Sequence, residues 1–415
     1  MKKYGCIGKK LSHSYSKEIH ARLADYEYEL IELSEEEIVP FFEKKDFEAI
    51  NVTIPYKQTV IPYLDSVSDT AMRIGAVNTI VNRDGKLYGY NTDYYGMKAL
   101  VERVGIDLNK KKVLVLGTGG TSKTACVVAS DMGADRVITV SRNKTDNHVT
   151  YEEAVALHAD ADVIINTTPS GMYPDCDSKP IDISKFECLK GVVDAVYNPL
   201  RTNLVLDAQE RGIRAEGGLY MLVMQAVAAV EKFLDTTVLR DKAESVFRSV
   251  CAQKENVVIT GMPGSGKSTV GKLLDIKGYD FYDTDAMIEE YCGCTIKELI
   301  DTKGERAFRD IEAVMIRDVS SKGGRIISTG GGAILREENV RSLKRNGRLF
   351  FIDADLSRLC ATTDRPLSDT DEKLKRLYNE RISIYKATAD VTVPDMDTPE
   401  MEAEYILDKR MELIV

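Results

Sequence analysis

Residues 256–269 read Asn256-Val-Val-Ile-Thr-Gly-Met-Pro-Gly-Ser-Gly-Lys-Ser-Thr269. The stretch predicts a short apolar strand, then the motif Gly261-x-x-x-x-Gly266-Lys267-Ser268, then the start of a helix. In such a P-loop, successive backbone N–H groups and the helix N-terminus converge on a phosphate chain. Lys267 reaches the β- and γ-phosphates, and Ser268 can ligate Mg²⁺. Because a strand precedes the motif and a helix follows it, an ordinary glycine-rich turn is the weaker interpretation.

The position of this motif divides the chain. A P-loop normally follows the first strand of its domain, so roughly 250 residues before it form a separate folding unit. A chain of 415 residues is long enough for two or three domains, each with its own core. The sequence therefore predicts an N-terminal protein and a C-terminal kinase-like module that meet near residue 252.

The composition argues against several classes of protein. The net charge of -10 disfavours a general binder of nucleic acid or anionic membranes, because such binding needs clustered positive charge. No apolar run approaches a membrane span, and the N-terminus becomes charged too early for a signal peptide. The eight cysteines and four histidines are scattered. We therefore expect reduced thiols, no structural metal site and a cytoplasmic location.

The first 93 residues alternate apolar strands with helical stretches and predict an α/β domain. The Asp84-Gly85 dipeptide predicts a hairpin turn between two of the strands. The expected strands are 4–8, 26–33, 49–53, 76–81 and 86–90, and the expected amphipathic helix is Ser16–Leu23.

A second unit begins with an apolar strand at 111–117, which runs into Gly117-Thr-Gly-Gly120-Thr-Ser122 and a helix. The glycines let backbone approach a pyrophosphate at the helix N-terminus, although Ser122 stands where G-x-G-x-x-G has its third glycine. The next strand ends in Ser141-Arg142-Asn143-Lys144, which has no acidic residue for a ribose 2′-OH. Arg142 and Lys144 there favour a 2′-phosphate, and hence NADP(H) over NAD(H).

Two further strands are expected at 161–167 and 191–195, followed by a strongly apolar helix over 218–233. This helix can simply dock the halves of the N-terminal protein together. Gln225 in its middle needs a hydrogen-bond partner, which a bound ligand can supply.

Together these segments make residues 1 to about 240 resemble the shikimate dehydrogenase family. The motifs that carry the resemblance, in order, are Leu11-Ser-His-Ser14-Tyr-Ser16, Asn51-Val-Thr53-Ile-Pro-Tyr-Lys57, Gly75-Ala-Val-Asn78-Thr, Asn91-Thr-Asp93, Asn166-Thr-Thr-Pro-Ser-Gly-Met172, Asp194–Pro199 and Gly218–Gln225. One departure is that the family's Asn-Arg-Thr segment stands as Ser141-Arg142-Asn143, without a second Arg, for which Lys144 is a substitute. The resemblance implies a substrate-binding domain at 1–93 and about 218–250, around a Rossmann-like NADP-binding domain at 94–217.

The chemistry fits the same residues. Reduction of a ketone needs a hydride from nicotinamide on one face and a proton donor at the carbonyl oxygen. Lys57 can stabilise the developing alkoxide and deliver the proton, and Asp93 can hold that ammonium in place. The resemblance implies that Ser14 and Ser16 bind the substrate carboxylate and that Thr53, Asn78 and Gln225 bind ring hydroxyls. For NADP(H), it implies Gly117, Gly119, Gly120, Thr121, Ser141, Arg142, Lys144 and Gly218.

The helix-prone stretch Leu239–Glu255 leads into the P-loop domain, expected over 253–415. There, a strand at 279–285 ends in two acids that can serve Mg²⁺ and a substrate hydroxyl. Another strand ends in Gly330–Gly332, where bare backbone can approach a ligand. The polar segment around Arg365 suits a mobile lid.

This set resembles the shikimate kinase family over residues 256 to about 415. The resemblance implies that Arg309 and Arg381 bind the shikimate carboxylate and that Asp285 orients or deprotonates the attacking hydroxyl. Lys267 and Arg365 would neutralise charge on the transferring phosphoryl group. The implied ATP ligands are Gly261, Gly264, Ser265, Gly266, Lys267, Ser268, Thr269 and Arg365; the Mg²⁺ ligands are Ser268 and Asp283; the shikimate ligands are Asp285, Arg309, Gly330, Gly331, Gly332 and Arg381.

The two resemblances imply a bifunctional α/β enzyme that reduces 3-dehydroshikimate to shikimate with NADPH and then phosphorylates shikimate with ATP. One alternative is an NAD(H)-dependent quinate/shikimate dehydrogenase fused to a kinase for another small hydroxy acid; the Ser141-Arg142 strand end opposes it. Another is that one half is a nucleotide-sensing module without turnover, which the intact Lys57/Asp93 and Lys267/Asp285 sets oppose. A homo-oligomer is compatible with the sequence.

Overall fold

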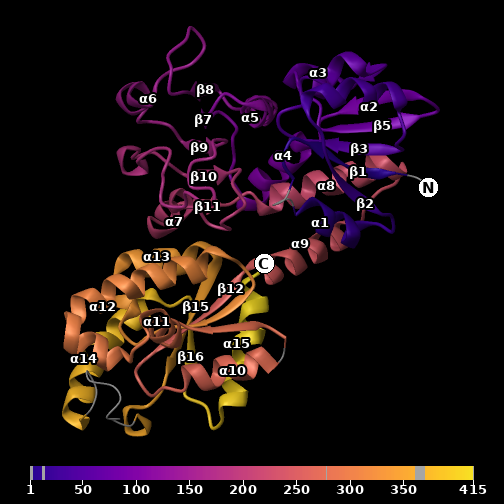
Figure 1. Cartoon of the computed structure of the whole chain (residues 1–415). Coiled ribbons are helices and arrows are strands. Elements are labelled where there is room, and N and C mark those ends of the chain that lie inside the picture. The colour runs from indigo at the N-terminus through magenta and orange to yellow at the C-terminus, as the bar shows by residue number, and fades with distance from the viewer. Residues whose placement is uncertain (1–2, 12–14, 277, 360–369, 415) are drawn as a thin grey trace. The chain divides into compact units, whose positions relative to one another are not determined.

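The structure, a computed structural model, describes residues 3–11, 15–276, 278–359 and 370–414 (Figure 1). The chain forms two compact units, Met1–Val250 and Cys251–Val415. The first unit holds two sheets and the second holds one.

The first sheet is mixed, with strand order β2-β1-β3-β5-β6-β4. Its strands are β1 (Tyr4–Gly8), β2 (Tyr28–Glu32), β3 (Ala49–Val52), β4 (Ser66–Val67), β5 (Thr79–Arg83) and β6 (Lys86–Tyr90). The helices around it are α1 (Ser16–Leu23), α2 (Ile38–Lys44), α3 (Asp69–Ile74) and the later α8 (Leu219–Leu234). In Figure 1, α1 and α8 lie on one side of this sheet and α2 on the other.

Alternating side chains build a core on each face of this sheet. Ile7, Ile50 and Ile80 pack with α2 on one face. Their chain neighbours, such as Cys6 and Ala49, pack with α8 on the other. The predicted hairpin between β5 and β6 is present: Asp84 and Gly85 have φ values of 53° and 82°, the left-handed geometry of a type I′ turn.

The second sheet is parallel, with strand order β11-β10-β9-β7-β8. It comprises β7 (Lys112–Leu116), β8 (Arg136–Val140), β9 (Val163–Asn166), β10 (Gly191–Asp194) and β11 (Arg214–Glu216), with α4 (Asp93–Val104), α5 (Gly120–Asp131), α6 (Tyr151–Leu157) and α7 (Asn203–Glu210). The strand order reverses at β7, because β8 lies on one side of it and β9 on the other. Ligands of such sheets bind outside the carboxyl ends of the strands at this reversal.

Helix α4 joins the two sheets of the first unit by packing closely on α8. A Cβ added at Gly96 of α4 would lie 2.4 Å from the backbone oxygen of Met221 on α8. Only glycine therefore permits this approach of the two helices.

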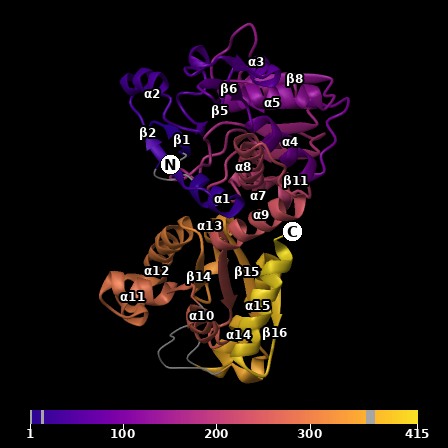
Figure 2. The same ribbon diagram turned by 90° about the vertical axis from the view of Figure 1, so that its right-hand side faces the viewer.

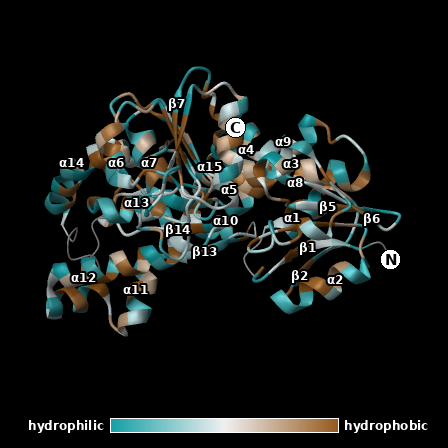
Figure 3. Ribbon diagram, turned by 90° about the horizontal axis from the view of Figure 1, so that it is seen from above, coloured by the Kyte–Doolittle hydropathy of each residue, from teal (hydrophilic) through white to brown (hydrophobic). Residues whose placement is uncertain are grey.

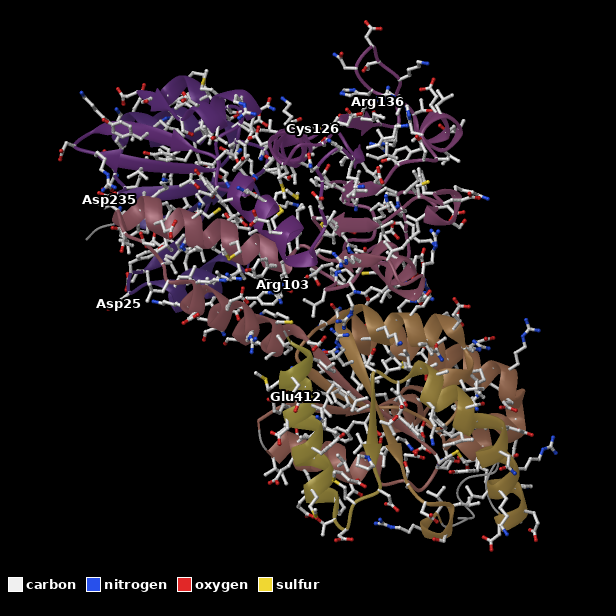
Figure 4. The ribbon with its side chains drawn as sticks, turned by 180° about the vertical axis from the view of Figure 1, so that it is seen from behind. Asp25, Arg103, Cys126, Arg136, Asp235 and Glu412 are labelled. Carbon is white, nitrogen blue, oxygen red and sulfur yellow. The ribbon has the colours of Figure 1, made fainter. Side chains whose placement is uncertain are left out.

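Helix α9 (Arg240–Lys254) is held to the first unit through Arg103 of α4, which Figure 4 labels. The Arg103 guanidinium lies 4.5 Å from the ring centroid of Tyr220 and 4.4 Å from that of Phe247 on α9. It also pairs with Glu216 at 3.2 Å and with Glu244 of α9 at 3.3 Å.

The second unit is a parallel sheet with strand order β13-β14-β12-β15-β16. Its strands are β12 (Asn256–Gly261), β13 (Asp280–Asp283), β14 (Arg325–Ser328), β15 (Gly347–Asp353) and β16 (Val391–Pro394), and its helices are α10 (Lys267–Ile276), α11 (Thr284–Cys292), α12 (Ile296–Ser321), α13 (Glu337–Asn346), α14 (Asp371–Thr388) and α15 (Pro399–Leu413). Figures 1 and 2 show α10 and α15 on one side of this sheet and α12 and α13 on the other.

The fold class predicted from the sequence, α/β in both units with a P-loop domain at the C-terminus, is confirmed. Figure 3 shows hydrophilic and hydrophobic segments alternating along α12, as expected of a helix with one packed and one exposed side. Among the described residues, no helix combines the length and the apolar character that a membrane crossing requires.

We expect Gly96→Ala to destabilise the first unit. The cost of overpacking should fall toward the upper end of roughly 1–3 kcal/mol, because the new methyl group meets backbone that cannot rotate away. This exceeds the about 1 kcal/mol that Ala gains over Gly in a helix. Differential scanning calorimetry of the full chain would measure the loss. Gly119→Ala is the matched control, since a Cβ there meets nothing within 4 Å; equal melting of both variants would contradict the packing argument.

Candidate active sites

A cleft of about 1040 Å³ in the first unit brings residues of both sheets together. From the first sheet come Ile54, Pro55, Lys57 and Gln58; from the second come Gly117–Thr121, Ser141–Asn143, Tyr151 and Thr167–Ser170. The expected proton donor and the expected nucleotide-binding turn therefore line one cavity.

The glycine-rich turn between β7 and α5 has the geometry that a dinucleotide needs. Gly117 has a φ of 110°, and a Cβ there would lie 2.9 Å from the hydroxyl of Thr167. Ser122, at the place of the third glycine, closes the turn by donating its hydroxyl to the Gly117 carbonyl at 2.6 Å. A Cβ at Gly119 would meet nothing, and one at Gly120 only the Lys57 side chain at 3.9 Å. Bare backbone at the N-terminus of α5 thus faces open space, which fits a pyrophosphate.

The end of β8 distinguishes the two expected 2′-phosphate ligands. Arg142 is exposed and lines the cleft. Lys144 instead forms an ion pair with Glu153 of α6. The geometry favours Arg142 as the cation that meets a 2′-phosphate.

Lys57, which lines the cleft, forms a hydrogen-bonded ion pair with Asp93. The Lys57 ammonium donates to Asp93 Oδ2 at 2.6 Å, and the side chains are only 18% and 10% exposed. Asn78 donates its amide to the other carboxylate oxygen at 2.8 Å. Asp93 is also the first residue of α4, where the helix dipole favours a negative charge.

The remaining expected ligands of this unit are placed as follows. Gln225 of α8 donates its amide to the Leu222 carbonyl at 2.9 Å. The N–H of Gly218 donates to the Val196 carbonyl at 2.8 Å, and a Cβ there would lie 2.3 Å from the Ala195 oxygen, so packing alone requires this glycine. Thr53 follows β3, and Ser16 begins α1. Ser14 lies outside the described residues.

Asn51, Thr79 and Thr92 belong to the motifs of the first unit, but the sequence alone indicated no role for them. All three are buried, and their side chains hydrogen-bond with one another and with Asn78. Their polarity beside apolar strand residues could have indicated buried hydrogen bonds, because a buried polar group needs a partner.

Asp194 is the last residue of β10 and holds the carboxyl end of this strand. Its carboxylate is fully buried and accepts hydrogen bonds from Asn166 at 2.9 Å, Val196 N–H at 3.0 Å and Thr202 at 2.6 Å. Burial raises the pKa of Asp194 to about 6, although the three donors oppose this shift.

A second cleft, of about 620 Å³, lies in the second unit beside the P-loop. Gly261, Gly264 and Gly266 have φ values of 157°, 86° and 88°, which glycine adopts readily. Lys267 is nearly buried and donates to the Met262 carbonyl at 2.9 Å. Ser265 and Thr269 lie on the same loop and on the start of α10.

Ser268 and Asp283 fit a Mg²⁺ ion. The Ser268 hydroxyl lies 2.6 Å from Asp283 Oδ2, so two oxygen donors converge beside the P-loop. Asp283 uses its other oxygen to cap α11, accepting from the N–H groups of Asp285 and Ala286. In phosphate-transfer sites, Mg²⁺ is typically held by one or two carboxylates together with phosphate oxygens.

The glycine triplet packs directly against the predicted shikimate ligands. A Cβ at Gly330 would lie 2.5 Å from Asp285 Oδ1, and one at Gly332 would lie 2.2 Å from the Arg309 guanidinium. Arg309 Nη1 contacts both carboxylate oxygens of Glu312, at 3.0 and 2.9 Å. Glu312 is fully buried, and this burial raises its pKa. The sequence alone indicated no role for Glu312.

Arg381 lies in the same cleft as Arg309 and donates to the Gly331 carbonyl at 3.0 Å. Burial lowers the pKa of Arg381. Tyr385, one turn further along α14, donates its hydroxyl to the Gly331 carbonyl and lies 2.9 Å from the Gly261 carbonyl of the P-loop. Arg365 lies outside the described residues.

Both units resemble known protein families. Residues 6–80 match the family model of the shikimate dehydrogenase substrate binding domain, and residues 263–411 match that of shikimate kinase. Shikimate dehydrogenase (NADP(+)) of Clostridium perfringens is 37% identical over 268 residues, which cover 60% of this chain and 98% of that protein. The two resemblances drawn from the motifs are thereby confirmed.

Two solved structures resemble the first unit. Shikimate dehydrogenase 1 of Peptoclostridium difficile is 34% identical, with 60% of this chain and 98% of that one covered and a TM-score of 0.56. Shikimate 5-dehydrogenase of Thermus thermophilus, solved in complex with NADP(H) and shikimate, is 27% identical, with 60% and 99% covered and a TM-score of 0.54.

We expect Asp194 to make the first unit less stable as the pH rises from about 4 to about 6. Because its folded pKa is raised from 3.8 to about 6, the folded state binds more protons than the unfolded state in this window. The free energy of unfolding should therefore fall by about 3 kcal/mol across it.

Asp194→Asn should remove this contribution, since its amide can donate to Thr202 and still accept from Val196. Calorimetry of wild type and variant between pH 4 and 7 would measure the difference. Asp182→Asn is the control: hydrogen bonds from Ser184 lower the Asp182 pKa, so its contribution has the opposite sign. A difference between wild type and Asp194→Asn that is independent of pH would contradict the assignment.

Proposed function

Because the chain belongs to the shikimate dehydrogenase family and carries a shikimate kinase domain, we propose that it catalyses two consecutive reactions of the shikimate pathway. The first unit reduces 3-dehydroshikimate to shikimate with NADPH. The second unit phosphorylates shikimate with ATP to shikimate 3-phosphate. The hydroxyl made in the first reaction is the one phosphorylated in the second. The observation that carries the proposal is the Lys57–Asp93 pair in the cleft of the glycine-rich turn.

In the dehydrogenase reaction, Lys57 acts as the proton donor. The chemistry that NADPH supplies when bound is hydride transfer to the ketone carbon. As the carbonyl oxygen develops into an alkoxide, Lys57 gives it a proton. Asp93 keeps the Lys57 ammonium within reach of that oxygen. Ser14, Ser16, Thr53, Asn78 and Gln225 bind the substrate, and the turn at Gly117–Thr121 with Arg142 holds the dinucleotide.

In the kinase reaction, the shikimate hydroxyl attacks the γ-phosphorus, the bond to the β-phosphate oxygen breaks, and ADP leaves. Asp285 orients the hydroxyl or takes its proton, while Arg309 and Arg381 bind the carboxylate. Ser268 and Asp283 would hold Mg²⁺, which supplies charge neutralisation on the phosphate oxygens. Lys267 and Arg365 add to that neutralisation.

The proposed domain bounds follow from these proposed functions. Residues 1–93 and about 218–250 bind the dehydrogenase substrate, 94–217 bind NADP(H), and 253–415 form the kinase. The return of α8 to the first sheet supports the split substrate domain.

A single incubation of the full chain tests the function. With 3-dehydroshikimate, NADPH, ATP and Mg²⁺, we expect NADPH consumption, ADP release and accumulation of shikimate 3-phosphate. Without NADPH, 3-dehydroshikimate should release no ADP, because the hydroxyl to be phosphorylated has not formed. Shikimate supplied directly should release ADP at once. Quinate and NADH in parallel reactions test the alternative pairing. Consumption of NADPH without release of ADP would refute the proposed phosphorylation of shikimate by the second unit.

Lys57→Ala should lower dehydrogenase turnover by roughly 10²–10⁴-fold, the usual contribution of a positioned acid or base. Binding of NADPH and ADP release from directly supplied shikimate should be unchanged. Lys98→Ala, which removes an exposed lysine paired loosely with Glu102 at 3.9 Å, is the control. Turnover close to that of the wild type in Lys57→Ala would remove Lys57 from the mechanism.

A further inference from the structure

A chain of buried hydrogen bonds leads from Tyr28 on β2 to the Lys57–Asp93 pair. Tyr28 donates its hydroxyl to Asn51 Oδ1 at 2.6 Å, and Asn51 Nδ2 donates to Thr79 Oγ1 at 3.1 Å. Thr79 Oγ1 lies 3.1 Å from Asn78 Oδ1, and Asn78 Nδ2 donates to Asp93 at 2.8 Å. The chain crosses from β2 to β3 and β5, where Asn51 and Thr79 are register partners.

The chemistry of the donors fixes the direction of each bond. The backbone N–H of Thr92 lies 2.6 Å from Asn78 Oδ1 and can only donate, so the Asn78 amide must turn its NH₂ group toward Asp93. Thr79 accepts the Asn51 amide proton and therefore donates its own proton toward Asn78, either directly or through the Thr92 hydroxyl, which lies 3.0 Å from Thr79 Oγ1 and 3.2 Å from Asn78 Oδ1. No residue of the chain can reverse its role without losing a bond.

Because these side chains are buried, breaking any of the hydrogen bonds between Tyr28 and Asp93 costs free energy. Tyr28, Asn51, Asn78 and Thr79 are each at most 6% exposed, so a donor or acceptor without its partner has no water to turn to. Burial also raises the pKa of Tyr28 well above its ordinary value, so its hydroxyl remains a donor. The His20 ring stacks on the Tyr28 ring, with centroids 4.0 Å apart.

We propose that Tyr28 and Thr79 are positioning residues for the dehydrogenase reaction. They fix the Asn78 amide, and through it the orientation of the Asp93 carboxylate that holds the Lys57 ammonium. Neither touches the reacting atoms. The inference rests on the proposed function of the first unit and assigns to it two residues that lie beneath the site.

Substitutions that delete one hydroxyl at a time test this in the full chain, with shikimate and NADP⁺ as substrates. Thr79→Val, which removes one donor to Asn78 Oδ1 and the acceptor of the Asn51 amide, should lower kcat roughly 10- to 100-fold, the range known for groups that orient a metal ligand. Tyr28→Phe, one bond further away, should lower it on the order of 5-fold, the equivalent of one hydrogen bond. The KM for NADP⁺ should be unchanged in both.

Two matched variants separate positioning from stability. Tyr26→Phe deletes a hydroxyl in the same cluster, but that hydroxyl bonds His20 at 2.6 Å and lies off the chain, so kcat should be unchanged. Thr79→Ser keeps the hydroxyl and should restore kcat relative to Thr79→Val, even where the smaller side chain lowers the melting temperature.

Loss of kcat in Thr79→Val and Tyr28→Phe, with normal turnover in Tyr26→Phe and recovery in Thr79→Ser, supports the proposal. Equal kcat in Tyr28→Phe, Thr79→Val and wild type overturns it. So does a fall in kcat that follows the melting temperature through all four variants. A wild-type chain that does not reduce NADP⁺ with shikimate overturns the proposed dehydrogenase function itself, and that result is distinguishable from the others.

Discussion

The first unit depends on keeping an ammonium and a carboxylate together where little water reaches them. Removing either partner of a buried ion pair leaves an uncompensated charge, which costs several kcal/mol. Lys57 comes from the loop after β3 and Asp93 from the first turn of α4, so the pair ties that loop to the helix that joins the two sheets. The cleft, the glycine-rich turn and the hydrogen bonds behind Asn78 all surround this one contact.

In the second unit, glycine residues without side chains let charged groups pack closely against the backbone. Gly330 and Gly332 have no side chains because Asp285 and Arg309 occupy the space that a Cβ would need. Arg381 and Tyr385 then bind the carbonyl of Gly331 between them. Because Gly330 and Gly332 have no side chains, Asp285 and Arg309 can lie directly against this loop, and the buried Glu312 carboxylate accepts hydrogen bonds from Arg309 there.

Much of this architecture was predictable, because local patterns encode it. The P-loop, the Asp84-Gly85 turn and the helix at Ser16–Leu23 follow from short-range rules, and the ordered motifs indicated both families. The roles of Asn51 and Thr79 were not predictable, since they become neighbours only through the antiparallel register of β3 and β5. The pairing of Lys144 with Glu153, nine residues further along the chain, likewise depends on where α6 begins. The functional roles of the site residues, Ser14 and Arg365 included, stay predictions.

Helix α9 bears on how two enzymes can come to share a chain. Glu244 and Phe247, in the first part of α9, contact the Arg103 guanidinium of the first unit. The last residues of α9, Cys251–Lys254, belong to the second unit. There the Ala252 and Glu255 carbonyls accept hydrogen bonds from Arg410 of α15. A break of the chain before α9 removes the Glu244 carboxylate from the first unit and so from Arg103. A break after α9 removes the Ala252 carbonyl from the second unit and leaves Arg410 with the Glu255 carbonyl. Each unit therefore depends on contacts made by α9 for part of its stability.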